Sequence, residues 1–171
     1  DSFIFDWYYY DDGPYLQRGL DEGYWGAPNN SRLKFALMWA NHDWLELHPY
    51  KKGTPQTVVF PGRVSPESFE KIGDHLIKDY FSHPSYWKID GKPYFSFYDL
   101  TKLLENFGSV KDTRAALDAF RAKAKAAGLP GLHLNAVAWG QPILPGERVP
   151  VDSGALVRDL GFDSVTSYVW V

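Results

Sequence analysis

Short, strongly apolar segments alternate along the chain with amphipathic ones, and polar or aromatic side chains follow most of the apolar segments. Residues 2–10 and 33–40 are two such apolar segments, and the second is an uninterrupted run that predicts a strand buried on both faces. Residues 93–99, 131–139 and 163–171 have the same character. Because helical segments separate most of them, we expect five parallel strands.

The helices expected between these strands have clear sequence signals. In residues 65–81, Ser65 can cap a helix that begins at Pro66, and apolar residues then recur on one face. Residues 112–127 predict a second helix, and a short one is expected at 154–160. This alternation of strand and helix predicts an α/β fold.

Two segments between these elements have turn-forming composition. Residues 41–63 contain three prolines and two glycines, which predict a long irregular stretch of the kind ordered by a ligand site. The pair Asp90 and Gly91 predicts the turn of a hairpin whose second arm is the strand at 93–99.

The side chains at the strand ends decide between the two main α/β architectures. No Gly-rich phosphate loop follows any strand, so the usual signature of a nucleotide-binding doubly wound sheet is missing. Polar and aromatic residues gather instead at the strand ends, where barrel enzymes have their active sites. They are Asp6, Trp7, Trp39, Asn41, Tyr98, Asp99, Trp139, Tyr168 and Trp170. We expect a (β/α)8 barrel of the TIM type. Five strands cannot close it, so residues 1–171 are expected to form one partial barrel domain of a larger chain.

The stretch "WANHDW" from Trp39 to Trp44 is the strongest local feature. Its two tryptophans can form walls against a sugar ring, while Asn41 and Asp43 hydrogen-bond the hydroxyl groups. His42 is also expected to contact the ligand because of these neighbours. The alternative is that the tryptophans pack under a loop and that Asn41 or Asp43 bonds its own backbone in a turn. The position at a strand end favours the ligand site.

Composition narrows the class of ligand. Aromatic residues make up 17% of the chain, which suits a site that stacks flat apolar faces and hydrogen-bonds at their rims. A net charge of -3 without a basic block argues against nucleic acid and favours sugars. No apolar run is long enough to span a membrane, and no signal peptide is visible. The absence of cysteine excludes disulfides and thiolate metal sites.

The titratable residues do not identify a catalyst. Glycoside hydrolysis needs a pair of carboxylates, and the candidates are Asp6, Asp43, Glu46 and Asp99. An aspartate at a strand end is more often a helix cap or a hydrogen-bond anchor, so no catalytic residue is assigned. The five histidines have no metal-ligand spacing, and no metal is expected.

Two motifs together resemble the glycoside hydrolase family 99-like proteins, including the group known as WbsX-like. They are "FALMWANHDW" and, after a helix, "HPSYWKIDGKPYFSFYD". The resemblance extends from Phe3 to Val171 and implies a (β/α)8 barrel that binds glycans. The characterised endo-acting members are retaining α-mannosidases that need no cofactor. Trp39, Asn41 and Trp44 match the motif and would line glycan subsites, and Tyr168 would contact the substrate near the scissile bond.

The resemblance also implies where catalysis occurs. The catalytic glutamates of the family lie on a later barrel segment, and nothing in this sequence matches that segment. We therefore expect a retaining glycoside hydrolase acting on an oligo- or polysaccharide. The alternatives are a glycosyltransferase or other polysaccharide-assembly protein, and a non-catalytic glycan-binding barrel. A periplasmic or extracellular location is favoured if the full protein carries a signal peptide, and the oligomeric state stays open. The expected ligand-contacting side chains are Asp6, Trp39, Asn41, His42, Asp43, Trp44, Tyr98, Asp99, Trp139, Tyr168 and Trp170.

Overall fold

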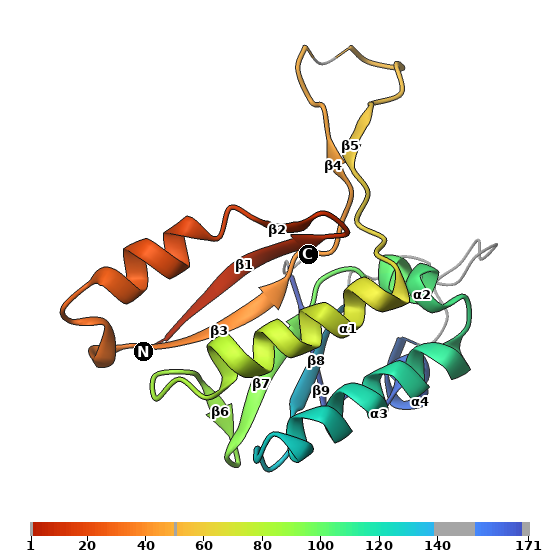
Figure 1. The fold of residues 1–171 in the computed structure, drawn as a ribbon. Helices are drawn as coiled ribbons and strands as arrows, with labels where there is room; N and C mark the ends of the chain where they lie inside the picture. Colours follow the sequence, from red (N-terminus) through yellow and green to blue (C-terminus); the bar gives the residue numbers. More distant parts are fainter. Residues whose placement is uncertain (1, 50, 139–152, 169–171) are drawn as a thin grey trace.

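A mostly parallel sheet forms the centre of the protein (Figure 1). The computed structural model describes residues 2–49, 51–138 and 153–168. Within these ranges the strands follow the order β2-β1-β3-β7-β8-β9, and β6 pairs with β7. The parallel strands are β1 (Ser2–Tyr10), β3 (Lys34–Trp39), β7 (Lys92–Phe97), β8 (His133–Ala138) and β9 (Ser164–Ser167). The prediction of five parallel strands is therefore confirmed for the described residues.

The antiparallel strands and the helices connect and cover this sheet. Antiparallel pairs are formed by β2 (Gly13–Tyr15), β4 (Trp44–Leu45), β5 (Val58–Phe60) and β6 (Lys88–Ile89). The α-helices are α1 (Pro66–His75), α2 (Leu100–Phe107), α3 (Val110–Ala126) and α4 (Ser153–Leu160). Irregular helical turns are η1 (Gly19–Tyr24), η2 (Asn30–Arg32) and η3 (Leu76–Phe81), which continues α1.

Local sequence signals account for most of these elements. The Ser65 hydroxyl accepts a hydrogen bond from Ser68 N at 3.1 Å and so caps α1, as predicted. Asp90 and Gly91 both have positive φ, which is the geometry of the tight turn expected between β6 and β7. The helix α2 was not predicted, although Asp99 caps it and Gly108 ends it with φ of 82°.

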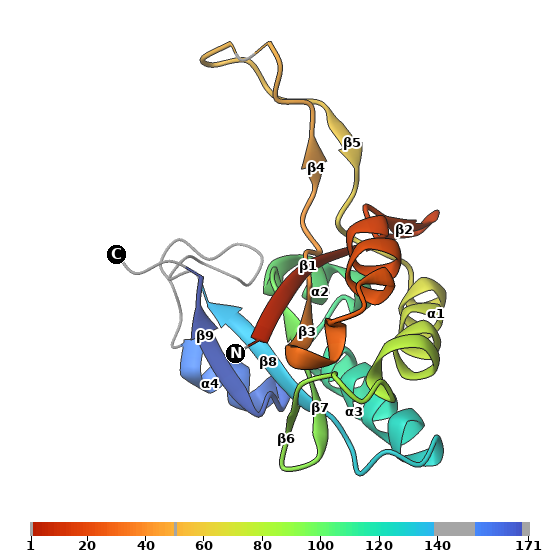
Figure 2. The ribbon, with the colours of Figure 1, turned by 90° about the vertical axis from the view of Figure 1, so that its left-hand side faces the viewer.

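The two faces of the sheet differ in what covers them (Figure 2). Residues in register across β1, β3, β7 and β8, namely Trp7, Trp39, Phe97 and Ala136, lie on the face against which the helices pack. We call this the helix-covered face. The opposite face carries Asp6, Met38, Ser96 and Asn135, which are also in register. We call it the helix-free face, because the described helices contribute their apolar side chains to the other side.

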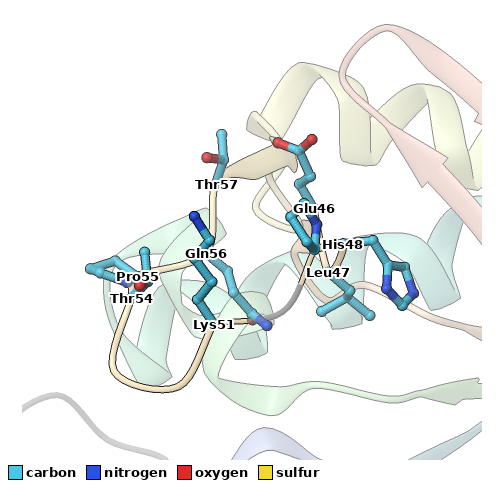
Figure 3. Close-up of a pocket in the computed structure, with 9 residues that line it drawn as sticks. Glu46, Leu47, His48, Lys51, Thr54, Pro55, Gln56 and Thr57 are labelled. Carbon is cyan, nitrogen blue, oxygen red and sulfur yellow. The ribbon is translucent and has the colours of Figure 1, made fainter.

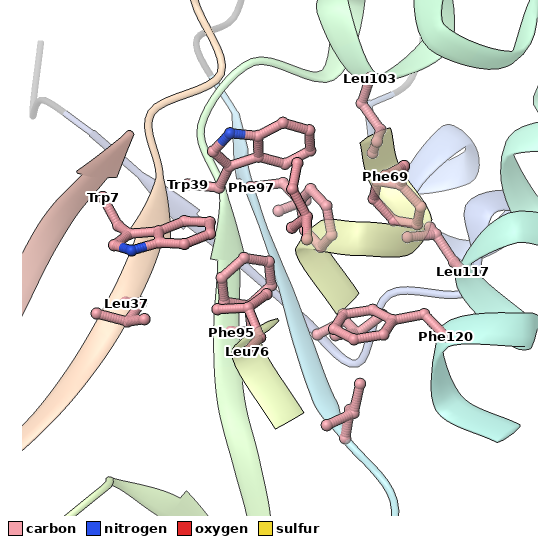
Figure 4. Close-up of a cluster of buried hydrophobic side chains, with 14 of the residues drawn as sticks. Trp7, Leu37, Trp39, Phe69, Leu76, Phe95, Phe97, Leu103, Leu117 and Phe120 are labelled. Atoms are coloured by element: carbon pink, nitrogen blue, oxygen red, sulfur yellow. The ribbon is translucent and has the colours of Figure 1, made fainter. Parts of the chain in front are cut away.

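The core fills the space between the helix-covered face and the helices. Figure 4 shows Trp39 and Phe97 of the sheet beside Phe69 of α1, with Leu117 and Phe120 of α3. These side chains are almost completely buried. Large aromatic side chains dominate this core, and each contributes about 1.5–3 kcal/mol of apolar burial.

Residues 41–63 differ from the expectation of an irregular stretch. They contain a two-stranded hairpin, β4–β5, that projects from the edge where the parallel strands end (Figures 1 and 2). We call residues 44–60 the arm. The two strands are too short to give a periodic signal, and a long connection separates them, so the sequence pattern did not reveal their pairing.

Candidate functional site

Aromatic side chains meet at the carboxyl ends of the parallel strands. Tyr8 lies near the end of β1, and its ring centroid is 5.5 Å from that of Trp44 and 5.9 Å from that of His42. The His42 ring also stacks on Trp44 at 6.4 Å with an interplanar angle of 17°. These three side chains form one side of the site.

The other side of the site comes from β7 and β9. Tyr98 follows β7, and its ring centroid lies 5.4 Å from that of His42. Tyr168 follows β9 and meets Tyr98 edge-on, with ring centroids 5.1 Å apart. We call Tyr8, His42, Trp44, Tyr98 and Tyr168 the aromatic cluster. It brings together residues from four separate parts of the chain.

Polar groups of the aromatic cluster face solvent in part. Tyr168 is 48% exposed, while Tyr8, His42, Trp44 and Tyr98 are half-buried. His42 Nδ1 lies 2.9 Å from the backbone oxygen of Asp43, and because a carbonyl oxygen only accepts, Nδ1 carries the proton. In the neutral ring Nε2 is then a hydrogen-bond acceptor.

The phenol groups of Tyr8 and Tyr98 stay protonated over the physiological range. Burial raises the pKa of Tyr98 to about 12, and the neighbouring Tyr168 and Asp6 act in the same direction. Burial and Asp6 likewise raise the pKa of Tyr8. A neutral phenol both donates and accepts a hydrogen bond, which is the pattern that a sugar hydroxyl needs.

Asp6 is an exposed carboxylate at the edge of the aromatic cluster. It lies two residues before Tyr8 on β1, and side chains alternate along a strand, so both are on the helix-free face. Its negative charge acts on both Tyr8 and Tyr98. The structure therefore brings together Asp6, His42, Trp44, Tyr98 and Tyr168 of the residues named from the sequence.

Trp39 lies elsewhere, which corrects the expectation that it walls a ligand site. Its side chain is fully buried in the core, where it packs on Phe69 and Phe97. Its indole N–H donates to the Tyr9 backbone oxygen at 3.2 Å. Trp39 is in register with Trp7 on the helix-covered face, so it points away from the aromatic cluster.

Asn41 is fully buried and joins two strand ends. Its Nδ2 donates to the Asp99 backbone oxygen at 2.7 Å, and its Oδ1 accepts from Asp99 N at 2.8 Å. This pair of bonds fixes the end of β3 against the end of β7. Asn41 therefore positions the loops that carry His42 and Tyr98.

Asp43 anchors the base of the arm. Its Oδ1 accepts from Gly62 N at 2.8 Å, and its Oδ2 lies 3.1 Å from the Lys102 ammonium. Partial burial acts to raise the pKa of Asp43, but the Gly62 hydrogen bond and Lys102 together lower it. A Cβ on Gly62 would lie 2.4 Å from the His42 backbone carbon, so only glycine fits there.

Asp99 has a structural role as well. Its side chain accepts from Lys102 N at 3.0 Å and caps α2, and burial raises its pKa despite this hydrogen bond. Both aspartates therefore have the anchoring role that the sequence analysis considered the more common one. Trp139 and Trp170 lie outside the described residues.

Three contributors to the site are not among the ligand-contacting residues assigned from the sequence. Tyr8 could have been found, because it alternates with Asp6 along β1. Lys102 and Gly62 gave no local signal, since each meets Asp43 through a contact distant in the chain. Within the described ranges, no three His, Cys, Asp or Glu side chains are grouped as a metal site would require, and no helix is long and apolar enough to cross a membrane.

Comparison with known proteins gives one match. A family model described as Glycosyltransferase WbsX matches residues 1–167, which is nearly the whole chain. No curated protein and no solved structure matches. The resemblance to WbsX-like proteins, inferred from two motifs, is thereby confirmed.

Proposed function

The chain belongs to the WbsX family, which is glycan-related, and on this premise we propose that the aromatic cluster binds the glycan substrate of a retaining glycoside hydrolase. One observation carries this proposal. Stacked rings, neutral phenols, an imidazole and the Asp6 carboxylate converge on the edge where the parallel strands end. Aromatic faces match the apolar faces of sugars, and the polar groups match their hydroxyls.

We further propose that the sheet is part of a (β/α)8 barrel. The parallel strands follow one another in sequence order from β1 to β9, without the reversal that marks a doubly wound sheet. The described helices pack on one face of the sheet, as they do around a barrel, whereas a doubly wound sheet has helices on both faces. The helix-free face would then line the barrel interior, and the aromatic cluster its mouth.

The proposed role of the described residues is binding rather than bond cleavage. Asp43 is paired with Lys102, Asp99 caps a helix, and Glu46 lies on the arm. Asp6 is the carboxylate proposed to contact the sugar. The resemblance assigns the catalytic glutamates to a later barrel segment and favours an endo-acting α-mannosidase-like enzyme.

A glycosyltransferase is the second candidate, because the description of the matching family names that activity. A transferase of this kind would use an activated sugar donor. Donor phosphates favour Gly-rich loops or helix N-termini next to basic side chains, and no Gly-rich loop follows the strands in the sequence. This absence makes hydrolysis the first candidate.

The experiment that tests the proposal uses the full-length protein. It is incubated with α-mannosides and with bacterial polysaccharides, in parallel with GDP-mannose plus acceptor oligosaccharides. We expect released reducing ends whose first-formed anomer, followed by NMR, has the configuration of the substrate. Transfer from GDP-mannose without release, or glycan binding without either reaction, would contradict the hydrolase proposal.

A matched pair of tyrosine variants tests the aromatic cluster itself. Tyr8→Phe removes a hydroxyl on the helix-free face, whereas Tyr9→Phe removes one on the opposite face of the same strand. Loss of one hydrogen bond to the glycan weakens binding by roughly 3- to 10-fold. We expect this loss for Tyr8→Phe and unchanged affinity for Tyr9→Phe, measured by calorimetry. Equal effects of both changes on glycan affinity would contradict the proposal that the aromatic cluster binds the glycan.

A further inference from the structure

The arm begins and ends among aromatic residues next to the aromatic cluster. Trp44, its first residue, contacts Tyr15 with ring centroids 5.3 Å apart. Phe60, its last residue, stacks on Tyr10 at 5.4 Å with an interplanar angle of 25°. The Asp43 contacts with Gly62 and Lys102 fix this base. The arm is therefore attached firmly to the site and projects outward from it (Figure 1).

A pocket of about 240 Å³ lies between the two sides of the arm (Figure 3). Its lining residues are Glu46, Leu47, His48, Pro49, Lys51, Thr54, Pro55, Gln56 and Thr57. Hydroxyl, amide, carboxylate, ammonium and imidazole groups thus surround a small apolar surface. No residue that the aromatic cluster uses lines this pocket, so it is a separate site.

The chemistry of this pocket suits a chain of neutral sugars. Glu46 and Lys51 have opposite charges, so the pocket lacks the clustered cations that a lipid surface or a strongly acidic polymer requires. The described residues that line it, which exclude residue 50, contain no Trp, Tyr or Phe, the usual anchors of protein interfaces. Short polar side chains beside Pro and Leu surfaces can instead contact sugar hydroxyls and ring faces.

From these observations we infer that the arm carries a second glycan subsite, so that the ligand is a polysaccharide segment long enough to contact both the aromatic cluster and the arm pocket. This inference rests on the proposed function of the aromatic cluster. The pocket lining begins at Glu46, two residues after Trp44, and continues along both sides of the arm, so a ligand that contacts both the aromatic cluster and the far part of the pocket must extend along the arm. The arm thereby selects for chain length.

The test measures affinity against glycan length with the full-length protein. The probes are size-fractionated oligosaccharides from the polysaccharide that the wild-type protein binds on a glycan array. In one variant, Asn-Gly replaces residues 47–56, because Glu46 N already bonds to Thr57 O at 2.9 Å and a two-residue turn can close that pair. This variant lacks the pocket but keeps Trp44 and Phe60.

Two neighbouring lysines give a matched comparison that does not alter the hairpin. Lys51 lines the pocket and Lys52, the next residue, does not. We expect Lys51→Ala to weaken binding of long fragments by roughly 3-fold, as for one lost hydrogen bond, and Lys52→Ala to leave it unchanged. Both changes remove one positive charge, so a general effect of charge would act on both equally.

We expect the affinity of the wild-type protein to rise with glycan length. The variant with the shortened arm should bind the longest fragments about 10-fold more weakly than the wild type, and short fragments equally well. Affinity that does not change with length, or a shortened arm that keeps the rise, would overturn the inference and leave the aromatic cluster as a glycan site. Absence of any glycan binding by the wild-type protein on the array would overturn both proposals.

Discussion

Trp39 and Trp44 lie in the same short motif but in different physical environments. Trp39 occupies the last position of β3, where alternation directs its side chain to the helix-covered face and into the core. Trp44 lies beyond the strand and stacks on His42 at the partly exposed strand-end edge. One tryptophan therefore contributes to stability, and the other is available to a ligand.

Replacing each of these tryptophans by Phe separates the two roles. Trp39→Phe removes volume from a close-packed core and leaves the Tyr9 carbonyl oxygen without its donor. We expect it to lower the free energy of unfolding by about 2 kcal/mol, measured by urea denaturation, without changing the glycan affinity of the folded protein. Trp44→Phe should lower glycan affinity roughly 3-fold and change stability by less than about 1 kcal/mol. The reverse pattern would contradict both assignments.

At the scale of elements, the loops after β3 and β7 are held in place by side chains that were expected from the sequence to contact a ligand. Asn41 bonds the backbone of Asp99, and Asp43 joins the start of the arm to Gly62 and to Lys102 of α2. These contacts fix the segments that carry His42, Trp44 and Tyr98. The site is therefore positioned by a layer of buried or half-buried polar contacts beneath it.

The Asp43 contact predicts a pH-dependent loss of stability. Asp43→Asn keeps an acceptor for Gly62 N but loses the ion pair with Lys102, which should cost about 1 kcal/mol at pH 7 for these partly exposed groups. The folded-state pKa of Asp43 lies below the ordinary value of 3.8. Its stabilisation is therefore present above pH 3.8 and is lost as the pH falls through the lowered pKa.

Urea denaturation of wild-type and Asp43→Asn protein between pH 7 and pH 2.5 measures this effect. The difference in unfolding free energy should be constant near neutrality and shrink below pH 3.8. Asp159→Asn, which changes an exposed carboxylate, is the control and should have little effect at any pH. A difference that stays constant with pH would mean that the charge of Asp43 does not hold the arm.

The elements that could be predicted from sequence are those with local causes. The apolar run of β3, the Ser65 cap and the Asp90-Gly91 turn each depend on neighbouring residues, and each lies where it was expected. The arm depends on pairing between two short strands far apart in the chain, so it was missed. The helix α2 had a local signal in its capping residues, Asp99 and Gly108. It was not predicted because Asp99 was interpreted as a sugar contact.

At the scale of the whole molecule, the two faces of the sheet are built from different chemistry. The helix-covered face is aromatic and aliphatic, whereas polar side chains connect three strands on the helix-free face. Asn135 on β8 is fully buried and donates to Ser96 on β7 at 2.9 Å and to Thr166 on β9 at 3.0 Å. It also accepts from Ser164 at 2.8 Å. A barrel interior would enclose this network, and an open sheet would leave its outer hydroxyls in water.

Asn135→Leu distinguishes these two arrangements. Leucine has a similar size but cannot hydrogen-bond, so Ser96, Ser164 and Thr166 lose a partner. Inside a closed barrel they cannot turn to bulk water, and we expect the free energy of unfolding of the full-length protein to fall by about 3 kcal/mol in urea denaturation. Thr166→Val, which removes one hydroxyl from the edge of the same network, should cost about 1 kcal/mol. A loss below about 1 kcal/mol for Asn135→Leu would mean that water replaces its bonds, which contradicts a closed barrel around this face.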